Sequence, residues 1–143
     1  VAAVLGGPMS LLVPGLATRR PDQVAAAVLI AVPTAAALLG LLLAPASAPL
    51  LWAVLYGLGT GAAFPLSMTV VLLRTRDVEQ TGRLSAAAQS AGYLLAATGP
   101  VAVGALAEAT GGWRAGLVVL LAVLAAQTAA GVAAGRARLV TAA

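Results

Sequence analysis

Residues 24–43 read VAAAVLIAVPTAAALLGLLL, an apolar run in which no side chain carries a charge and Thr34 is the one polar residue. A helix needs roughly 20 such residues to cross the hydrocarbon core of a bilayer, which is about 30 Å thick. In water this surface would need polar residues to cover it, and the run supplies almost none. The stretch therefore predicts a membrane-spanning helix.

Apolar runs of similar length recur on both sides of this stretch. Helix is the spanning structure that fits them, because a transmembrane β-strand alternates polar and apolar residues over segments of about ten. We predict an all-α membrane protein with five transmembrane helices, at about residues 1–17, 24–43, 50–73, 84–106 and 115–134. Val1 already lies inside an apolar run, so we expect the chain to be a fragment of a longer protein.

The composition favours the same class of protein. Of 143 residues, 62% are hydrophobic and 8% are charged, whereas a soluble domain has roughly 25% charged residues. The chain has no cysteine and no histidine, which removes thiolate chemistry and the commonest metal ligand. We therefore expect no enzymatic activity, no catalytic residue, no metal and no cofactor.

Arginine occupies every second loop between the runs. One set of loops holds Arg19, Arg20, Arg74, Arg76, Arg83, Arg136 and Arg138. The opposite set holds only Arg114, and Trp52 and Trp113 lie near that boundary. Cytoplasmic loops are enriched in Lys and Arg, so we predict an integral protein of the plasma (inner) membrane with a cytoplasmic C-terminus. A net charge of +4 distributed in this way does not predict nucleic-acid binding.

Residues 57–62 read GLGTGA and match the dinucleotide-binding pattern GxGxxA. That pattern should follow a strand and open a helix, but here it lies in the middle of an apolar run. We interpret Gly57 and Gly61, four residues apart, as a surface of small residues on which another helix packs closely.

Prolines interrupt four of the five runs, at Pro8, Pro14, Pro33, Pro65 and Pro100. Each removes a backbone hydrogen bond, and such breaks are tolerated where neighbouring helices or a water-filled cavity satisfy the freed carbonyl. Bent helices are characteristic of proteins that rearrange around a central site. Kinks that only improve packing are the alternative interpretation.

Polar side chains in the third and fourth runs fall on helical stripes. The stripes are Tyr56, Thr60, Ser67 and Arg74 on the third run, and Ser85, Gln89 and Tyr93 on the fourth. Gln89 is the sharpest candidate, because a buried amide needs partners for two donors and an acceptor. An interhelical hydrogen bond is the alternative. The predicted substrate-binding residues are Gln89, Tyr93, Ser85 and Thr60, whereas Gln127 and Thr128 are interpreted as packing residues.

Two motifs lie between Gly57 and Arg114, namely FPL at residues 64–66 and LSAAAQSAGYLLAATGP at residues 84–100. With these motifs the segment resembles the second half of the major facilitator superfamily, in the branch of the cyanate permease and the 2-nitroimidazole transporter. The loop GLATRR at residues 15–20 resembles the basic loop motif of the superfamily, with Thr18 in place of the expected acid.

The resemblance implies that the five runs are helices eight to twelve of a twelve-helix carrier, in its C-terminal bundle. It also implies that runs one, three and four border the central cavity while runs two and five lie outside. We expect transmembrane transport of a small solute by alternating access, with the lipid bilayer, the small-molecule substrate and the N-terminal half of the transporter as partners. The alternative is a non-transporting membrane anchor or subunit.

Overall fold

The structure is a computed structural model that describes residues 23–136. Within this range the chain forms four α-helices and no strand, and the helices are α2 (Val24–Leu43), α3 (Pro49–Arg74), α4 (Val78–Thr110) and α5 (Arg114–Gly135). All four are long and apolar enough to cross a membrane. The prediction of an all-α membrane protein is confirmed for these four spans. The first predicted span, at residues 1–17, lies outside the described residues.

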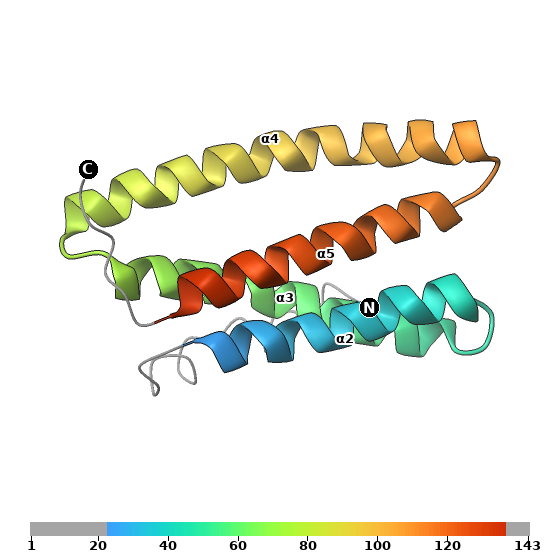
Figure 1. Cartoon of the computed structure of the whole chain (residues 1–143), viewed down its shortest axis with the longest axis horizontal. Coiled ribbons are helices and arrows are strands. Elements are labelled where there is room, and N and C mark those ends of the chain that lie inside the picture. Colours follow the sequence, from blue (N-terminus) through green and yellow to red (C-terminus); the bar gives the residue numbers. More distant parts are fainter. Residues whose placement is uncertain (1–22, 137–143) are drawn as a thin grey trace.

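The four helices run in alternating directions (Figure 1). The α2–α3 and α4–α5 connections lie at one end, and the α3–α4 connection and the last turn of α5 lie at the other. Arg74 ends α3 and Arg136 follows α5, so these arginines share one end of the helices. Trp113 precedes α5 and Trp52 lies in the first turn of α3, both at the opposite end.

Helix α2 packs against both α3 and α5, and its closest packing is on α3. Ala37 and Leu38 of α2 and Ala62 and Leu66 of α3 form the buried apolar core. A Cβ at Gly59 would collide with Thr34 and lie 2.9 Å from the backbone oxygen of Ile30. The two backbones therefore approach each other through small residues, as close helix packing in a membrane requires.

The glycine interpretation is confirmed in part. Gly57 is buried and Gly61 is half-buried, and both lie on the helix that packs on α2. The glycine that contacts α2 is Gly59. The prediction did not include it, because it was based on the spacing between Gly57 and Gly61. The GLGTGA pattern lies inside α3 with no strand before it in the described part of the chain, so its context is a helix–helix contact.

Trp52 joins the end of α2 to the start of α3. Its indole nitrogen donates to the backbone oxygen of Ala44, at 3.2 Å. Its ring covers Gly40, where a Cβ would lie 2.5 Å from ring atoms. Trp52 thereby helps to satisfy a carbonyl at the C-terminus of α2, which also accepts from the hydroxyl and the backbone nitrogen of Ser47.

Helix α4 stands apart from the other three (Figure 1). None of its residues is buried, and it touches α3 and α5 only sparsely. Tyr93, Leu94 and Leu95 are each about 70% exposed. Large apolar side chains on a spanning helix contact lipid or further helices, so this surface is a contact surface for apolar neighbours.

Helix α4 is also longer than the predicted run at residues 84–106. Its 33 residues extend about 50 Å at 1.5 Å per residue, beyond the bilayer core of about 30 Å. It begins early because Asp77 accepts a hydrogen bond from the backbone nitrogen of Gln80, at 2.7 Å, while the Gln80 side chain accepts from the backbone nitrogen of Arg76, at 2.8 Å. Its end is set by Gly111, whose φ of 69° is left-handed and favours glycine.

Three of the five prolines predicted to bend the runs lie within the described residues, and all three are inside helices. Pro33 is in α2, Pro65 in α3 and Pro100 in α4. Each helix continues past its proline, so the prolines do not end the helices. A bend at each of them stays a prediction, and Pro8 and Pro14 lie outside the described residues.

Candidate functional site

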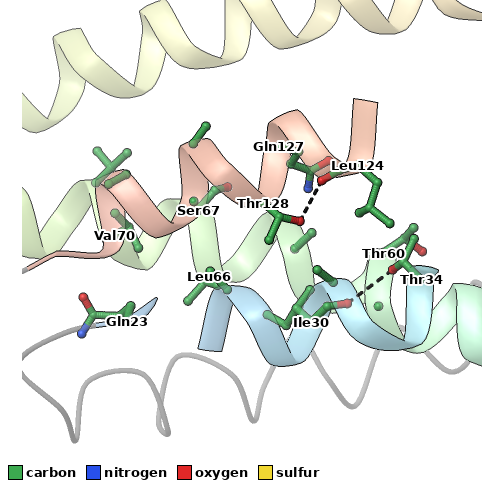
Figure 2. Close-up of a pocket in the computed structure, with 18 residues that line it drawn as sticks. Gln23, Ile30, Thr34, Thr60, Leu66, Ser67, Val70, Leu124, Gln127 and Thr128 are labelled. Carbon is green, nitrogen blue, oxygen red and sulfur yellow. Dashed lines mark hydrogen bonds between the residues drawn. The ribbon is translucent and has the colours of Figure 1, made fainter. Parts of the chain in front are cut away.

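A pocket of about 350 Å³ lies between α2, α3 and α5 (Figure 2). Most of its wall consists of alanine, glycine, valine, leucine and isoleucine. The polar residues that line it are Gln23, Thr34, Thr60, Ser67, Gln127 and Thr128. No charged residue of the described chain is among the lining residues. The pocket has the composition of a small-molecule site, which is mainly apolar with a few polar groups that fix orientation.

The hydroxyl groups of the pocket are already engaged as donors. Each donates to a backbone oxygen three or four residues earlier in its own helix, as seen for Thr34 (3.4 Å), Thr60 (2.8 Å), Ser67 (2.7 Å) and Thr128 (2.7 Å). A hydroxyl has one hydrogen to donate and two lone pairs to accept with. These four oxygens therefore act toward the pocket as hydrogen-bond acceptors.

Gln127 differs from the other polar lining residues. Its side chain is exposed and makes no hydrogen bond with any residue between 23 and 136. It lies on α5 beside Thr128 at the wall of the pocket (Figure 2). An amide carries two donors and an acceptor, so Gln127 can both donate and accept toward the pocket.

A polar cluster closes the three-helix unit where α3 and α5 end and α2 begins. Arg74 is only 9% exposed and Gln23 only 1%. The Arg74 Nη2 donates to Gln23 Oε1 at 2.6 Å and to the backbone oxygen of Gly135 at 2.8 Å, and its Nε donates to the backbone oxygen of Ala134 at 3.3 Å. The guanidinium thus lies at the carbonyl end of α5, where the helix dipole favours a cation.

The structure divides the predicted binding residues between two places. Thr60 lines the pocket, together with Ser67 of the same stripe. Ser85, Gln89 and Tyr93 lie on α4 and do not line it. Ser85 and Gln89 are half-buried and Tyr93 is 69% exposed. A role for these α4 residues in binding a substrate stays a prediction.

The two remaining members of the α3 stripe do not line the pocket. Tyr56 is exposed, and Arg74 is buried in the cluster that joins three helix ends. The assignment of Arg74 to a cavity-facing stripe is therefore wrong. Arg74 does lie on the same helical stripe as Thr60 and Ser67. Its guanidinium, however, donates to acceptors at the ends of the adjacent helices and so holds these ends together.

Gln127 and Thr128 are interpreted from the sequence as packing residues, and that interpretation stays a prediction. They line the pocket, and Gln127 is exposed there. The signal that could have found Gln127 is the one that selected Gln89, an amide in a span-length apolar run. The resemblance implies that runs two and five lie outside the central cavity of the carrier, and α2 and α5 contribute most of the wall of this pocket.

Comparison with known proteins finds several transporters. The chain is 40% identical over 135 residues to an uncharacterized transporter of Bacillus subtilis, YycB, a match that covers 92% of this chain and 33% of that protein. It is 44% identical over 104 residues to a putative anionic 4-hydroxy-benzoate permease of Thauera aromatica, covering 73% of this chain and 63% of that protein. It is 39% identical over 108 residues to the 2-nitroimidazole transporter of Escherichia coli, covering 76% and 27%.

These relatives are named as transporters or permeases, and none is named as an enzyme. The chain spans between 27% and 63% of their lengths. No family model matches the chain, and no solved structure matches it.

Proposed function

Because the chain is homologous to part of the transporters in the cyanate permease and 2-nitroimidazole transporter branch of the major facilitator superfamily, we propose that it is the C-terminal part of a carrier for a small solute. The observation that carries the proposal is 40% identity to a named transporter over 92% of this chain. Four span-length helices give the chain the membrane embedding that a carrier needs.

In this proposal the complete protein works by alternating access. Two bundles of helices rock around a site near the middle of the membrane and expose it to each side in turn. The chain supplies helices of the C-terminal bundle, and the N-terminal half of the transporter is its partner across the site. The sparse packing of α4 supports this arrangement, because its apolar surface is available to helices of the longer protein.

We place the carrier in the plasma (inner) membrane with its C-terminus in the cytoplasm. The support is that Arg74, Arg76 and Arg136 belong to one end of the helices, while Trp52 and Trp113 belong to the other. Basic residues favour the cytoplasmic side and tryptophans favour the interface.

For the substrate we propose a small planar solute with polar substituents. The names of two relatives give 4-hydroxybenzoate and 2-nitroimidazole, and both molecules are single flat rings that carry polar groups. A pocket lined by small apolar residues and a few hydroxyl oxygens suits the uncharged members of this class. The proposal names a class of solute and no individual molecule.

The predicted residues Gln89, Tyr93 and Ser85 of α4, with Thr60 of α3, are proposed to contact the substrate. The test is Gln89→Ala in the full-length protein, assayed by uptake of labelled 2-nitroimidazole and 4-hydroxybenzoate in cells. Loss of one hydrogen bond worth roughly 1 kcal/mol should lower uptake per molecule about fivefold. Abundance in the membrane should not change.

Ser90→Ala is the matched control for Gln89→Ala. Ser90 neighbours Gln89 on α4 and is exposed, so its truncation should leave uptake per molecule as it was. Equal uptake by the Gln89→Ala protein would remove Gln89 from the site. Absence of uptake of any tested solute by the unmodified protein would count against a carrier of this class.

A further inference from the structure

We propose that the pocket between α2, α3 and α5 binds a small, uncharged, planar solute that carries both a hydrogen-bond donor and an acceptor, with Gln127 as its main polar contact. The inference goes beyond the proposed function, because it concerns binding in this pocket and holds whether or not the bound solute is the transported one. The site differs from the α4 stripe of Ser85, Gln89 and Tyr93, which does not line this pocket.

The charge of the ligand follows from the wall of the pocket. None of the described lining residues carries a charge. The nearby guanidinium of Arg74 is engaged by Gln23, Ala134 and Gly135 at the closed end of the helices. An anion in this pocket would lose its hydration and gain no partner of opposite charge, which is costly. The pocket therefore selects against ions of either sign.

The hydrogen-bonding character follows from the hydroxyl groups. Four hydroxyl groups of the wall donate hydrogen bonds to backbone oxygens of their own helices, namely those of Thr34, Thr60, Ser67 and Thr128. Toward a ligand, their oxygens can therefore only accept. A ligand that carries a hydrogen-bond donor can therefore bond to one of these oxygens. Gln127 supplies the complementary donors and a further acceptor, so a primary amide or a similar donor–acceptor edge satisfies both.

Gln127 itself requires a partner. It lies eight residues before Gly135, the last residue of α5, which is roughly 12 Å along the axis at 1.5 Å per residue. At that depth of a spanning helix, lipid offers no hydrogen bonds. No residue between 23 and 136 bonds to it, so the amide is available to a polar ligand in the pocket.

The shape of the ligand follows from the small residues of the wall. Ala27 and Ala31 of α2, Gly59 and Ala63 of α3, and Gly131 of α5 line the pocket, so parts of its walls are flat and lie close to the backbone. A single aromatic ring fits such walls. The volume of about 350 Å³ lies at the small end of the range for ligand pockets.

Benzamide and benzoate are suitable probes, because they have nearly the same shape and differ in charge. Equilibrium binding of each is measured on the purified full-length protein, without any gradient or flux. We expect saturable binding of benzamide and at least about tenfold weaker binding of benzoate. In the Gln127→Leu protein, which keeps the volume of the side chain, benzamide binding should weaken about tenfold, the equivalent of one well-placed hydrogen bond.

Thr128→Val and Thr98→Val form a matched pair of variants. Both hydroxyls donate to a backbone oxygen of their own helix, but only Thr128 lines the pocket. Benzamide binding should weaken in Thr128→Val and stay the same in Thr98→Val. The pair keeps the inference testable if the Gln127→Leu protein fails to fold.

Three outcomes overturn the inference: no saturable binding of benzamide, equal affinity for benzoate, or unchanged benzamide affinity in a folded Gln127→Leu protein. Failure of the proposed function has a different signature. If the protein binds benzamide as expected but transports none of the tested solutes, the inference about the pocket stands and the carrier assignment is wrong. If the protein transports a tested solute but the Gln127→Leu change leaves benzamide binding intact, the carrier assignment stands and the inference about the pocket is wrong.

Discussion

At the scale of single residues, Gly59 limits how closely α2 and α3 can approach. Gly59→Ala would place a Cβ against Thr34 and 2.9 Å from the backbone oxygen of Ile30, and that oxygen cannot move without shifting α2. Overpacking of this kind costs about 1–3 kcal/mol. We expect a lower midpoint of thermal unfolding for the Gly59→Ala protein, measured on the purified full-length protein in detergent.

Gly92→Ala is the control for Gly59→Ala. A Cβ at Gly92 on α4 meets nothing within 4 Å, and alanine stabilises a helix interior by about 1 kcal/mol over glycine. The Gly92→Ala protein should unfold at the same or a higher temperature. An equal loss of stability in both variants would contradict the close approach at Gly59.

The sequence indicated which kinds of residue matter in each run better than it indicated which neighbouring helix or pocket each residue faces. The glycine-rich stretch of run three indicated a close helix contact, and Gly57 is buried, but the residue that meets α2 is Gly59. For Gln127 the residue type was informative, but the sequence did not predict that it lines a pocket. In both cases the missing information was the rotation of a helix relative to its neighbours, which hydrophobic periodicity gives poorly in runs that are apolar on every side.

At the scale of the elements, Arg74 joins three helix ends. Its bonds to Gln23 of α2 and to Gly135 of α5 connect segments that are far apart in sequence. Arg74→Gln removes these bonds and leaves carbonyls of α5 without their charged donor. Because hydrogen bonds to charged groups contribute about 1.5–3 kcal/mol each, we expect a clear loss of stability in thermal unfolding of the full-length protein.

Arg83→Gln is the matched control for Arg74→Gln. The Arg83 Nε lies 3.5 Å from Glu79 Oε1, but both side chains are about 80% exposed, and exposed ion pairs contribute little. The Arg83→Gln protein should unfold at the same temperature as the unmodified protein. A larger effect at Arg83 than at Arg74 would show that the buried cluster does not hold the helix ends.

The bounds of three helices could be predicted closely from the sequence. The predicted runs at residues 24–43, 50–73 and 115–134 agree with α2, α3 and α5 within one residue, because turn residues or charges flank each of them. Helix α4 could not be predicted to its full length, since its first turns are polar. They are held by the Asp77 cap and the Gln80 side chain, and an apolar-run criterion does not register such contacts.

At the scale of the whole molecule, the sequence predicted spanning helices and their alternating directions but not their neighbours. The pocket depends on α2, α3 and α5 meeting, whereas the predicted site paired residues of α3 with residues of α4. Chain order places α3 between α2 and α4, and α3 packs chiefly on α2. Small residues such as Gly59 and Ala37 decide this preference, because in a membrane close packing replaces the hydrophobic effect as the driving force.

The proposed orientation is testable because this chain has no cysteine, so a single introduced thiol can be labelled without background from it. Ser47 lies in the α2–α3 connection and Arg76 in the α3–α4 connection, both exposed, at opposite ends of the helices. With any cysteine elsewhere in the full-length protein replaced, Ser47→Cys should react with a membrane-impermeant maleimide in intact cells. Arg76→Cys should react only after the membrane is opened.

Arg136→Cys extends this test to the far end of α5. Arg136 is exposed and follows α5, so it should behave like Arg76→Cys and unlike Ser47→Cys. The physical reason is that the arginine-bearing ends resist transfer across the membrane and stay in the cytoplasm. Labelling of Arg76→Cys and Arg136→Cys, but not Ser47→Cys, from outside would reverse the orientation. Different behaviour of the two arginine positions would contradict the shared end on which the Arg74 cluster depends.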